Sequence, residues 1–302
     1  MDGVSCSEEG LSTRLSGVSE RIKALLMLTK PRISAMGAAV LLASALLASG
    51  GELSVSQVIV LIGIGLTVMG STTLNNCFDC DIDRRMKRTQ KRPLVTGAVD
   101  REAAWVWGGV LTLFGTALVA GFGKPVTVFL NSAAVLIYVG IYTPFLKRRV
   151  PWANEVGSLA GALPPVLGWL VGGGEGWTFP SALFLFVFFW QGPHFWAMAQ
   201  HFRQDYVRVG LPVRPLTDSP RSHRVRRAVF VTCLFFAGLL PAFLGGAGKL
   251  FFAGMILVGG GMILMEYFVL YLRRGRVINL FLYSLFHMAV FWMLLLLDGT
   301  AA

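Results

Sequence analysis

The chain has 302 residues, of which 55% are hydrophobic and 14% charged, and its formal net charge is +11 at pH 7. A soluble domain carries roughly a quarter charged residues, so this composition excludes an ordinary water-soluble globular protein. The positive charge is dispersed over short segments between apolar runs, which argues against a nucleic-acid partner. We therefore expect the chain to lie in a lipid bilayer, where its basic loops can contact anionic headgroups.

Residues 1–24 are polar and are predicted to form a cytoplasmic N-terminal segment. They show no clear cleavable signal, and they carry acidic residues that argue against a mitochondrial transit peptide. The four cysteines give no disulfide framework, and Cys77 and Cys80 have no second pair with which to bind zinc. We expect one domain, residues 25–298, in the inner membrane of a bacterial cell.

Nine apolar runs follow one another along the chain. Each is near the ~20 residues that a helix needs to cross the hydrocarbon core, and none shows the alternation of a membrane β-barrel. The prediction is an all-α polytopic membrane protein with nine transmembrane helices, at about 33–49, 55–74, 103–122, 125–145, 152–172, 179–199, 228–247, 250–271 and 278–297.

The basic residues predict how these helices are oriented. Of the 27 Lys and Arg residues, all but Lys124 and Lys249 lie before the first run or in the loops after the second, fourth, sixth and eighth runs. Loops that are rich in Lys and Arg stay on the cytoplasmic side of the membrane. Nine spans satisfy this distribution if the N-terminus is cytoplasmic and the C-terminus is outside.

Residues 75–94, "NNCFDCDIDRRMKRTQKRPL", place an unusual density of charge at the end of the second run. If the helix continues through Asp83, then Asn75, Asp79 and Asp83 share one face, and Asn76 lies at its edge. Carboxylates one turn apart repel each other, but Mg²⁺ reverses this because it prefers oxygen ligands, commonly one or two carboxylates plus substrate phosphates. The pattern predicts a magnesium platform for a phosphorylated substrate. The alternative is a solvated cytoplasmic helix end.

These motifs resemble the UbiA-type intramembrane prenyltransferases, and within them the protohaem IX farnesyltransferase (haem O synthase) family. The pattern from Asn75 to Leu94 is similar to that family almost residue for residue. The likeness covers about residues 25–298 and continues in the segments "LTKPRIS" (28–34), "YTPFLKRR" (142–149), "NEVGSLAGALPPVLGW" (154–169), "PHFWAMA" (193–199), "DYVRVGLP" (205–212) and "LFLYSLFHMAVFWMLLLLD".

The resemblance implies nine helices around a lateral central cavity that opens to the cytoplasmic side. It also implies Mg²⁺-dependent transfer of a farnesyl group from farnesyl diphosphate to a vinyl group of haem B, giving haem O. Haem B is then a substrate and not a permanent cofactor. Haem A synthase and terminal oxidases become candidate assembly partners.

The site residues that follow from the motif and the resemblance fall into five groups. The expected metal ligands are Asn75, Asn76, Asp79, Asp83 and Asp205. The expected diphosphate-binding residues are Asn75, Arg88, Arg92, Lys147, Arg148, Asn154, Arg203 and Tyr206. The residues expected to act in catalysis are Asp79, Asp83, Lys147, Asp205 and His194. The expected haem-binding residues are His194 and His287. Aromatic walls for the farnesyl cation are candidates at Phe188, Phe189, Trp190, Phe195 and Trp196.

Two alternatives remain open from the residues alone. The first is the same fold with another acceptor, such as a quinone precursor or chlorophyllide. The second is a transporter for an anionic solute. Transporters gather polar groups near the middle of the bilayer, whereas the charge in this sequence gathers at the ends of the spans. The sequence therefore favours the enzyme.

Overall fold

The computed structural model describes residues 19–272 and 276–299, so residues 1–18 of the predicted N-terminal segment lie outside the described residues. The regular structure within those ranges is helical, apart from one isolated bridge between Ala247 and Gly299. Eight of the described helices are long and apolar enough to cross a membrane. The predicted all-α polytopic fold is confirmed.

The fifth predicted span, 152–172, is a pair of short helices. α7 (Ala153–Gly161) ends where α8 (Leu163–Val171) begins. Pro164 and Pro165 lie in the first turn of α8, and a proline supplies no N–H for the preceding turn, so the helix breaks there. This break is why the nine predicted spans correspond to eight long helices and one interrupted pair within the described ranges.

The helix starts follow from local sequence. The Ser54 side chain accepts a hydrogen bond from the Gln57 backbone N–H, and the Gln57 side-chain oxygen accepts one from the Ser54 backbone N–H, so α3 (Val55–Arg85) begins with a capping box. Proline opens α2 (Pro31–Ala48) and α12 (Pro220–Phe243), where its missing N–H has no intrahelical partner to lose.

α3 packs tightly against α5 (Arg101–Phe122) through small residues. A Cβ atom added at Gly115 would lie 2.5 Å from the backbone oxygen of Gly63, and one added at Gly70 would lie 2.6 Å from the backbone nitrogen of Thr112. Small residues allow helix backbones to approach closely where lipid supplies no hydrophobic driving force. This contact gives the long α3, which carries the predicted site, a fixed neighbour.

The remaining long helices form a second group of four: α9 (Thr178–His201), α12, α13 (Lys249–Glu266, continued by the π-helix η2, Tyr267–Tyr271) and α14 (Val277–Asp298). Their shared core is aromatic, with the rings of Phe186 and Phe291 stacked at 3.6 Å between centroids. The charged pair Arg227 and Glu266 links α12 to α13 and is buried.

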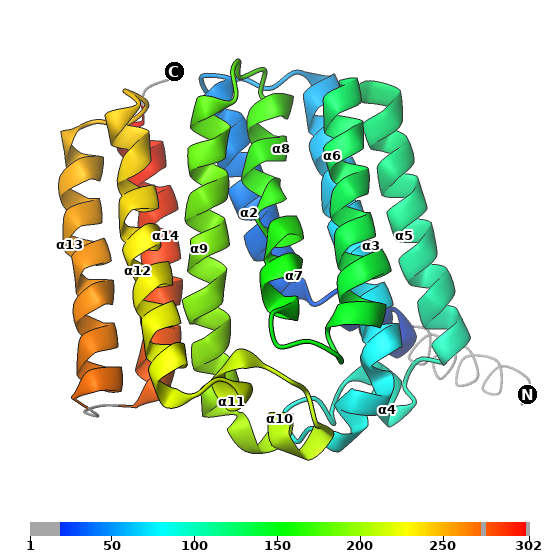
Figure 1. Ribbon diagram of the computed structural model, residues 1–302. Helices are drawn as coiled ribbons and strands as arrows, with labels where there is room; N and C mark the ends of the chain where they lie inside the picture. Colours follow the sequence, from blue (N-terminus) through cyan, green and yellow to red (C-terminus); the bar gives the residue numbers. More distant parts are fainter. Residues whose placement is uncertain (1–18, 273–275, 300–302) are drawn as a thin grey trace, which may run out of the picture.

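Three short helices, α4 (Pro93–Thr96), α10 (Arg203–Val209) and α11 (Arg214–Thr217), gather where α3 and α9 end, at the lower side of Figure 1. α6 (Pro125–Val135) continues as the π-helix η1 (Leu136–Leu146) and also ends at this side. We call this side the charged end, because the predicted aspartates and basic loops lie there. It is where the functional site must be sought.

Candidate active site at the charged end

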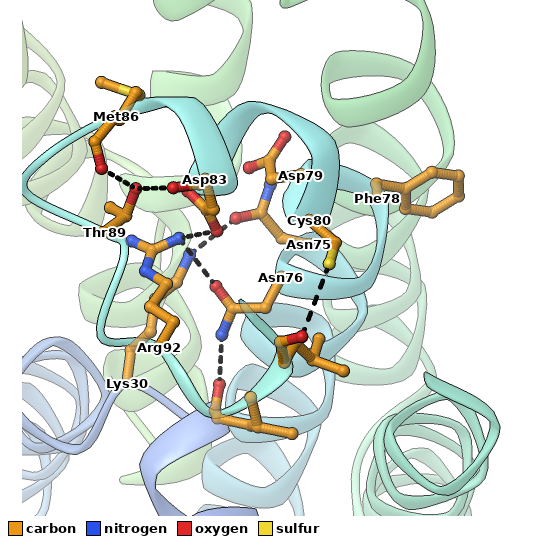
Figure 2. A network of polar contacts seen from close by, with 12 residues as sticks. Lys30, Asn75, Asn76, Phe78, Asp79, Cys80, Asp83, Met86, Thr89 and Arg92 are labelled. Atoms are coloured by element: carbon orange, nitrogen blue, oxygen red, sulfur yellow. Dashed lines mark hydrogen bonds and ion pairs between the residues drawn. The ribbon is translucent and has the colours of Figure 1, made fainter. Parts of the chain in front are cut away.

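The last turns of α3 carry the polar face that the sequence predicts. The α3 helix runs without interruption through Asp83, as expected. Asn75, Asn76, Asp79 and Asp83 are all buried, with at most 5% of each residue exposed to solvent. Figure 2 shows their side chains near one another at the end of the helix. Burying two carboxylates is costly unless each has a partner, so the surrounding cations decide what this face can do.

Three basic side chains from three different segments meet this face. Lys147, which follows η1, forms an ion pair with Asp79. Arg92 donates to Asp83 at 2.5 Å and to the Asn76 side-chain oxygen at 3.1 Å. Lys30 donates to the Asn75 side-chain oxygen at 2.6 Å (Figure 2). Arg92 and Lys147 balance the two carboxylates, and Lys30 adds a further positive charge whenever it is protonated, which suits an anionic ligand.

Lys30 was not among the residues predicted from the sequence. It lies immediately before Pro31, where the sequence shows only one more positive charge next to the first apolar run. Its backbone φ of 50° is unusual for a residue other than glycine, and such backbone conformations gather at functional sites. The unusual backbone conformation of Lys30 and its contact with Asn75 indicate a role in the site, and neither feature can be recognised from the sequence.

The environment shifts the pKa values of the two lysines in opposite directions. Burial and the neighbouring positive charges of Arg92 and Lys147 lower the pKa of Lys30 to about 7. Burial also acts to lower the pKa of Lys147, but the charge of Asp79 and its hydrogen bond outweigh that effect, so the pKa is raised. Lys147 therefore stays protonated at neutral pH.

The π-helix η1 positions Lys147. Its wider turn brings the Lys147 N–H to the Tyr142 carbonyl and the Thr143 hydroxyl to the Tyr138 carbonyl, in each case five residues back. Pro144, inside this segment, has no N–H for an α-helical bond. Thr143 also accepts a hydrogen bond from Asn75 at 3.1 Å, so η1 is fastened directly to the polar face of α3.

Asp205 fastens the loops at the charged end. Its carboxylate accepts hydrogen bonds from the backbone N–H groups of Lys87 and Arg88, at 3.1 and 3.0 Å. It therefore ties α10 to the loop that delivers Arg92. This role explains why the residue is buried, at 6% exposed. Its expected role as a metal ligand stays a prediction.

Three other predicted diphosphate-binding residues do not contact the buried aspartates of α3. Arg148 forms a bidentate pair with Asp81 on the exposed side of α3, away from the buried aspartates. Arg88 lies over the Phe202 ring, 5.5 Å from its centroid. Within the described ranges Arg203 makes no ion pair. The structure therefore brings Lys147 and Arg92 to the aspartates but not Arg148.

Tyr206 and Asn154 are the remaining predicted diphosphate-binding residues. Tyr206 is buried, its ring meets the edge of Phe195, and burial raises the pKa of its phenol. Asn154 opens α7, and its side-chain nitrogen is buried with no hydrogen-bond partner in the described part of the chain. An unpartnered buried donor here suits a phosphate oxygen.

The candidate aromatic walls separate into two sets. Phe188, Phe189 and Trp196 pack against Phe230 of α12, which is ordinary helix packing. Phe195 packs instead against the cluster that contains Ile82 and Met86, at the end of α3. Among the candidates Phe195 is therefore the ring closest to the aspartates by its contacts.

The two predicted haem-binding histidines lie where α9 and α14 meet, with His194 on α9 and His287 on α14. The His194 ring lies between those of Trp190 and Phe281, at 4.3 and 4.6 Å between centroids. His287 is fully buried against Phe186, and neither of its ring nitrogens has a partner among the described residues.

The donor set at the end of α3 fits a magnesium ion. One carboxylate oxygen of Asp79 is buried and has no hydrogen-bond partner in the described structure, so an acceptor is available for a cation. The described residues contain no group of three or more His, Cys, Asp or Glu side chains arranged to hold a metal. Two carboxylates with amide oxygens are instead the sparse set that Mg²⁺ uses when a substrate phosphate completes its coordination.

Comparison with known proteins agrees with this chemistry. Residues 37–295 match the UbiA prenyltransferase family. The chain is similar to protoheme IX farnesyltransferase of Aquifex aeolicus, with 34% identity over 292 residues, which is 95% of this chain and 99% of that protein.

Two solved structures share the fold. One chain, from a structural study of digeranylgeranylglyceryl phosphate synthase in membranes, has a TM-score of 0.75 and 16% identity, covering 92% of this chain and 98% of that one. A UbiA homologue from Archaeoglobus fulgidus bound to GPP and Mg²⁺ has a TM-score of 0.60 and 18% identity, covering 90% and 99%. The matched region contains every membrane helix except the first turns of α2 and the last turn of α14, and with the aspartate face of α3 it makes this chain a member of the UbiA prenyltransferase family.

Proposed function

We propose that this chain transfers a farnesyl group from farnesyl diphosphate to a vinyl group of haem B, giving haem O. The observation that carries the proposal is the pair of buried carboxylates Asp79 and Asp83, one helical turn apart, faced by Lys30, Lys147 and Arg92. The curated relative, matched over nearly its whole length, is named for this reaction and supports the choice of acceptor.

Asn75, Asn76, Asp79 and Asp83, with Asp205 as a further predicted ligand, would hold Mg²⁺. The bound ion would neutralise the charge that develops on the departing diphosphate. Lys147 and Arg92 pair with the carboxylates in this structure, so metal binding requires the carboxylates to exchange these partners. The exchange frees both cations to bind phosphate oxygens, together with Lys30 and the further predicted residues Arg88, Arg148, Asn154, Arg203 and Tyr206.

The reaction breaks the bond between the first farnesyl carbon and the diphosphate oxygen, and the electron pair leaves with the diphosphate. The terminal vinyl carbon of haem B then forms the new carbon–carbon bond with its π electrons. Water adds to the resulting cation next to the ring and loses a proton, which gives the hydroxyethylfarnesyl side chain. The chain contributes fixed positive charge where the negative charge develops. We propose that the Phe195 ring, which packs against the cluster at the end of α3, faces the allylic cation.

We place haem B at the charged end beside α9 and α14, with His194 and His287 as the candidate iron-binding residues. Imidazole is a common haem ligand. His194 is only partly buried, whereas His287 is enclosed completely, so His194 is the first candidate and His287 stays a prediction.

The experiment uses membranes from cells that express the full chain, supplied with haem B, farnesyl diphosphate and Mg²⁺, with the pigment mass measured after chromatography. The expected product is heavier than haem B by one farnesyl group plus water. Asp79→Ala and Asp83→Ala are expected to lower its formation by about 10²–10³-fold, the loss typical of removing one preorganised electrostatic contact.

Asp81→Ala is the matched control, because Asp81 lies on the same helix but on its exposed side, paired with Arg148. It should retain most of the activity and insert equally well. If the farnesyl mass appears on a quinone precursor or chlorophyllide instead, the acceptor assignment is wrong. Full activity in both the Asp79 and Asp83 variants contradicts the metal platform.

The protein is a multi-pass membrane protein, and we propose that it lies in the inner membrane of a bacterial cell with the charged end facing the cytoplasm. The distribution of Lys and Arg supports this orientation. A cytoplasmic charged end also gives access to water-soluble diphosphate while the prenyl tail lies in lipid. Assembly with haem A synthase or a terminal oxidase stays a prediction.

A further inference from the structure

The strongest unexplained arrangement outside the aspartate face surrounds the His194 imidazole. Ser284 of α14 makes three hydrogen bonds there. Its hydroxyl donates to the Phe281 carbonyl at 2.6 Å, its hydroxyl oxygen lies 2.8 Å from His194 Nδ1, and its backbone carbonyl accepts from the Trp190 indole at 2.6 Å. Ser284 therefore contacts the histidine, the Trp190 indole and the backbone of Phe281.

These contacts determine which nitrogen of His194 carries the proton. A carbonyl oxygen only accepts, so the single hydroxyl hydrogen of Ser284 goes to Phe281. The Ser284 oxygen must then accept at its second contact, which places the proton on His194 Nδ1. The other nitrogen, Nε2, is left with a free lone pair. It is not among the fully buried unpartnered atoms of the described residues, so Nε2 keeps some accessible surface.

The ring is also held in a fixed orientation. Trp190 stacks on one side at 20° between planes, and Phe281 stacks at 28°. Successive residues of a helix are 100° apart. On α9, Trp190 reaches α14, and Gln191 reaches the Ser158 carbonyl of α7. His194 lies 40° from Trp190 towards Gln191, so it points between α14 and α7.

We infer that His194 Nε2 is the axial ligand of the iron in the acceptor metalloporphyrin, and that Ser284 is the positioning residue that holds the imidazole in the required tautomer. The inference rests on the proposed function. A metal-binding imidazole almost always donates its other N–H to a fixed oxygen, which sets the ring orientation. His194 and Ser284 have this arrangement, and the Trp190 and Phe281 rings stack on the imidazole.

The test is spectroscopic and uses the purified full chain titrated with haem B. His194→Gly is expected to shift the absorption bands of the bound haem, and added imidazole is expected to restore them. Ser284→Ala should weaken haem binding by about 10- to 100-fold, the usual loss when the partner of a metal-bound histidine is removed. Ser284→Thr, which keeps the hydroxyl, should restore binding.

His201→Ala is the matched control, because His201 lies on the same helix but is exposed, and its spectrum should equal that of the unaltered chain. Unchanged bands and affinity in His194→Gly, while the unaltered chain farnesylates haem B, overturn the inference and leave the proposed function intact. An unaltered chain that binds haem through His194 but forms no farnesylated haem has the opposite meaning, because the proposed function then fails and the iron ligand stands.

Discussion

At the scale of single residues, the site depends on how buried charges are balanced. Asp79 and Asp83 each have a cationic partner, and Lys30, which contacts Asn75, adds a further positive charge when it is protonated. A buried carboxylate without a partner is strongly destabilising. The basic residues therefore have two roles: they stabilise the folded site before substrate binds, and they bind the diphosphate afterwards.

Lys30 offers the sharpest test of this view. Lys30→Met keeps the length of the side chain and removes the charge. We expect turnover of farnesyl diphosphate to fall by about 10- to 100-fold, because one charge-assisted hydrogen bond to the leaving group is lost. The measurement is the rate of haem farnesylation at saturating haem B. Arg32→Met, which removes an exposed charge two residues away, is the control, and an equal loss in both variants contradicts a specific role for Lys30.

The sequence predicts the aspartate face well because that face depends only on helical periodicity. Asn75, Asp79 and Asp83 are spaced by four residues, and any uninterrupted helix brings them together. Lys30 and Ser284 escape prediction because their roles depend on long-range contacts, with α3 for Lys30 and α9 for Ser284. Arg148 shows the converse, since topology brings it to the charged end but its side chain pairs with Asp81 on the other side of α3.

At the scale of helices, close packing of α3 against α5 holds the aspartate face in place. Gly115→Ala is expected to destabilise the protein by about 1–3 kcal/mol, because its Cβ would overlap the Gly63 and Thr67 backbones, which cannot move aside as a side chain can. Gly109→Ala, on the same helix, meets nothing within 4 Å. It should be neutral or slightly stabilising, since alanine favours helix over glycine.

The measurement for these glycine variants is the midpoint of thermal unfolding in detergent. The expected result is a lower midpoint for Gly115→Ala only. Equal midpoints for both variants contradict the packing argument. The sequence alone does not distinguish the two glycines, because the angular position of α5 against α3 decides which of them faces the neighbour.

α12 and α13 are connected by a buried ion pair that the proposed reaction does not use. Arg227 and Glu266 are 1% and 6% exposed, and Arg227 holds both carboxylate oxygens. Arg227→Met should destabilise the protein by about 3–5 kcal/mol, because it leaves Glu266 buried without a partner. Adding Glu266→Leu should recover most of that loss, since an apolar pair of similar volume is often as stable as the ion pair it replaces.

Thermal unfolding of the two single variants and the double variant measures this coupling as a double-mutant cycle. If the double variant is as unstable as the sum of the single variants, the two residues do not act as a pair. Haem farnesylation by the double variant is expected to continue, because neither side chain contacts the aspartate face.

At the scale of the whole molecule, the number of membrane-spanning segments is consistent with the distribution of Lys and Arg over the loops. The fold was predictable because apolar length and composition determine the membrane helices, and the one difference, the break between α7 and α8, follows from Pro164 and Pro165. The shape of the charged end was not predictable, since η1, α10 and α11 depend on tertiary contacts such as those of Asp205 and Thr143. The candidate site therefore lies where tertiary contacts, and not local sequence patterns, determine the backbone conformation.

The same molecule-wide pattern predicts which end faces the cytoplasm. Glu52 lies between α2 and α3, opposite the charged end, and Gln90 lies in the loop after α3; both are exposed. In a chain with Cys6→Ser and Cys233→Ser, we expect Glu52→Cys to react with a membrane-impermeant maleimide in intact cells. Gln90→Cys should react only after lysis, because Lys and Arg hold their loops in the cytoplasm. Cys77 and Cys80 are buried and give little background. Labelling of Gln90→Cys in intact cells reverses the orientation and places the diphosphate site on the wrong side for a cytoplasmic substrate.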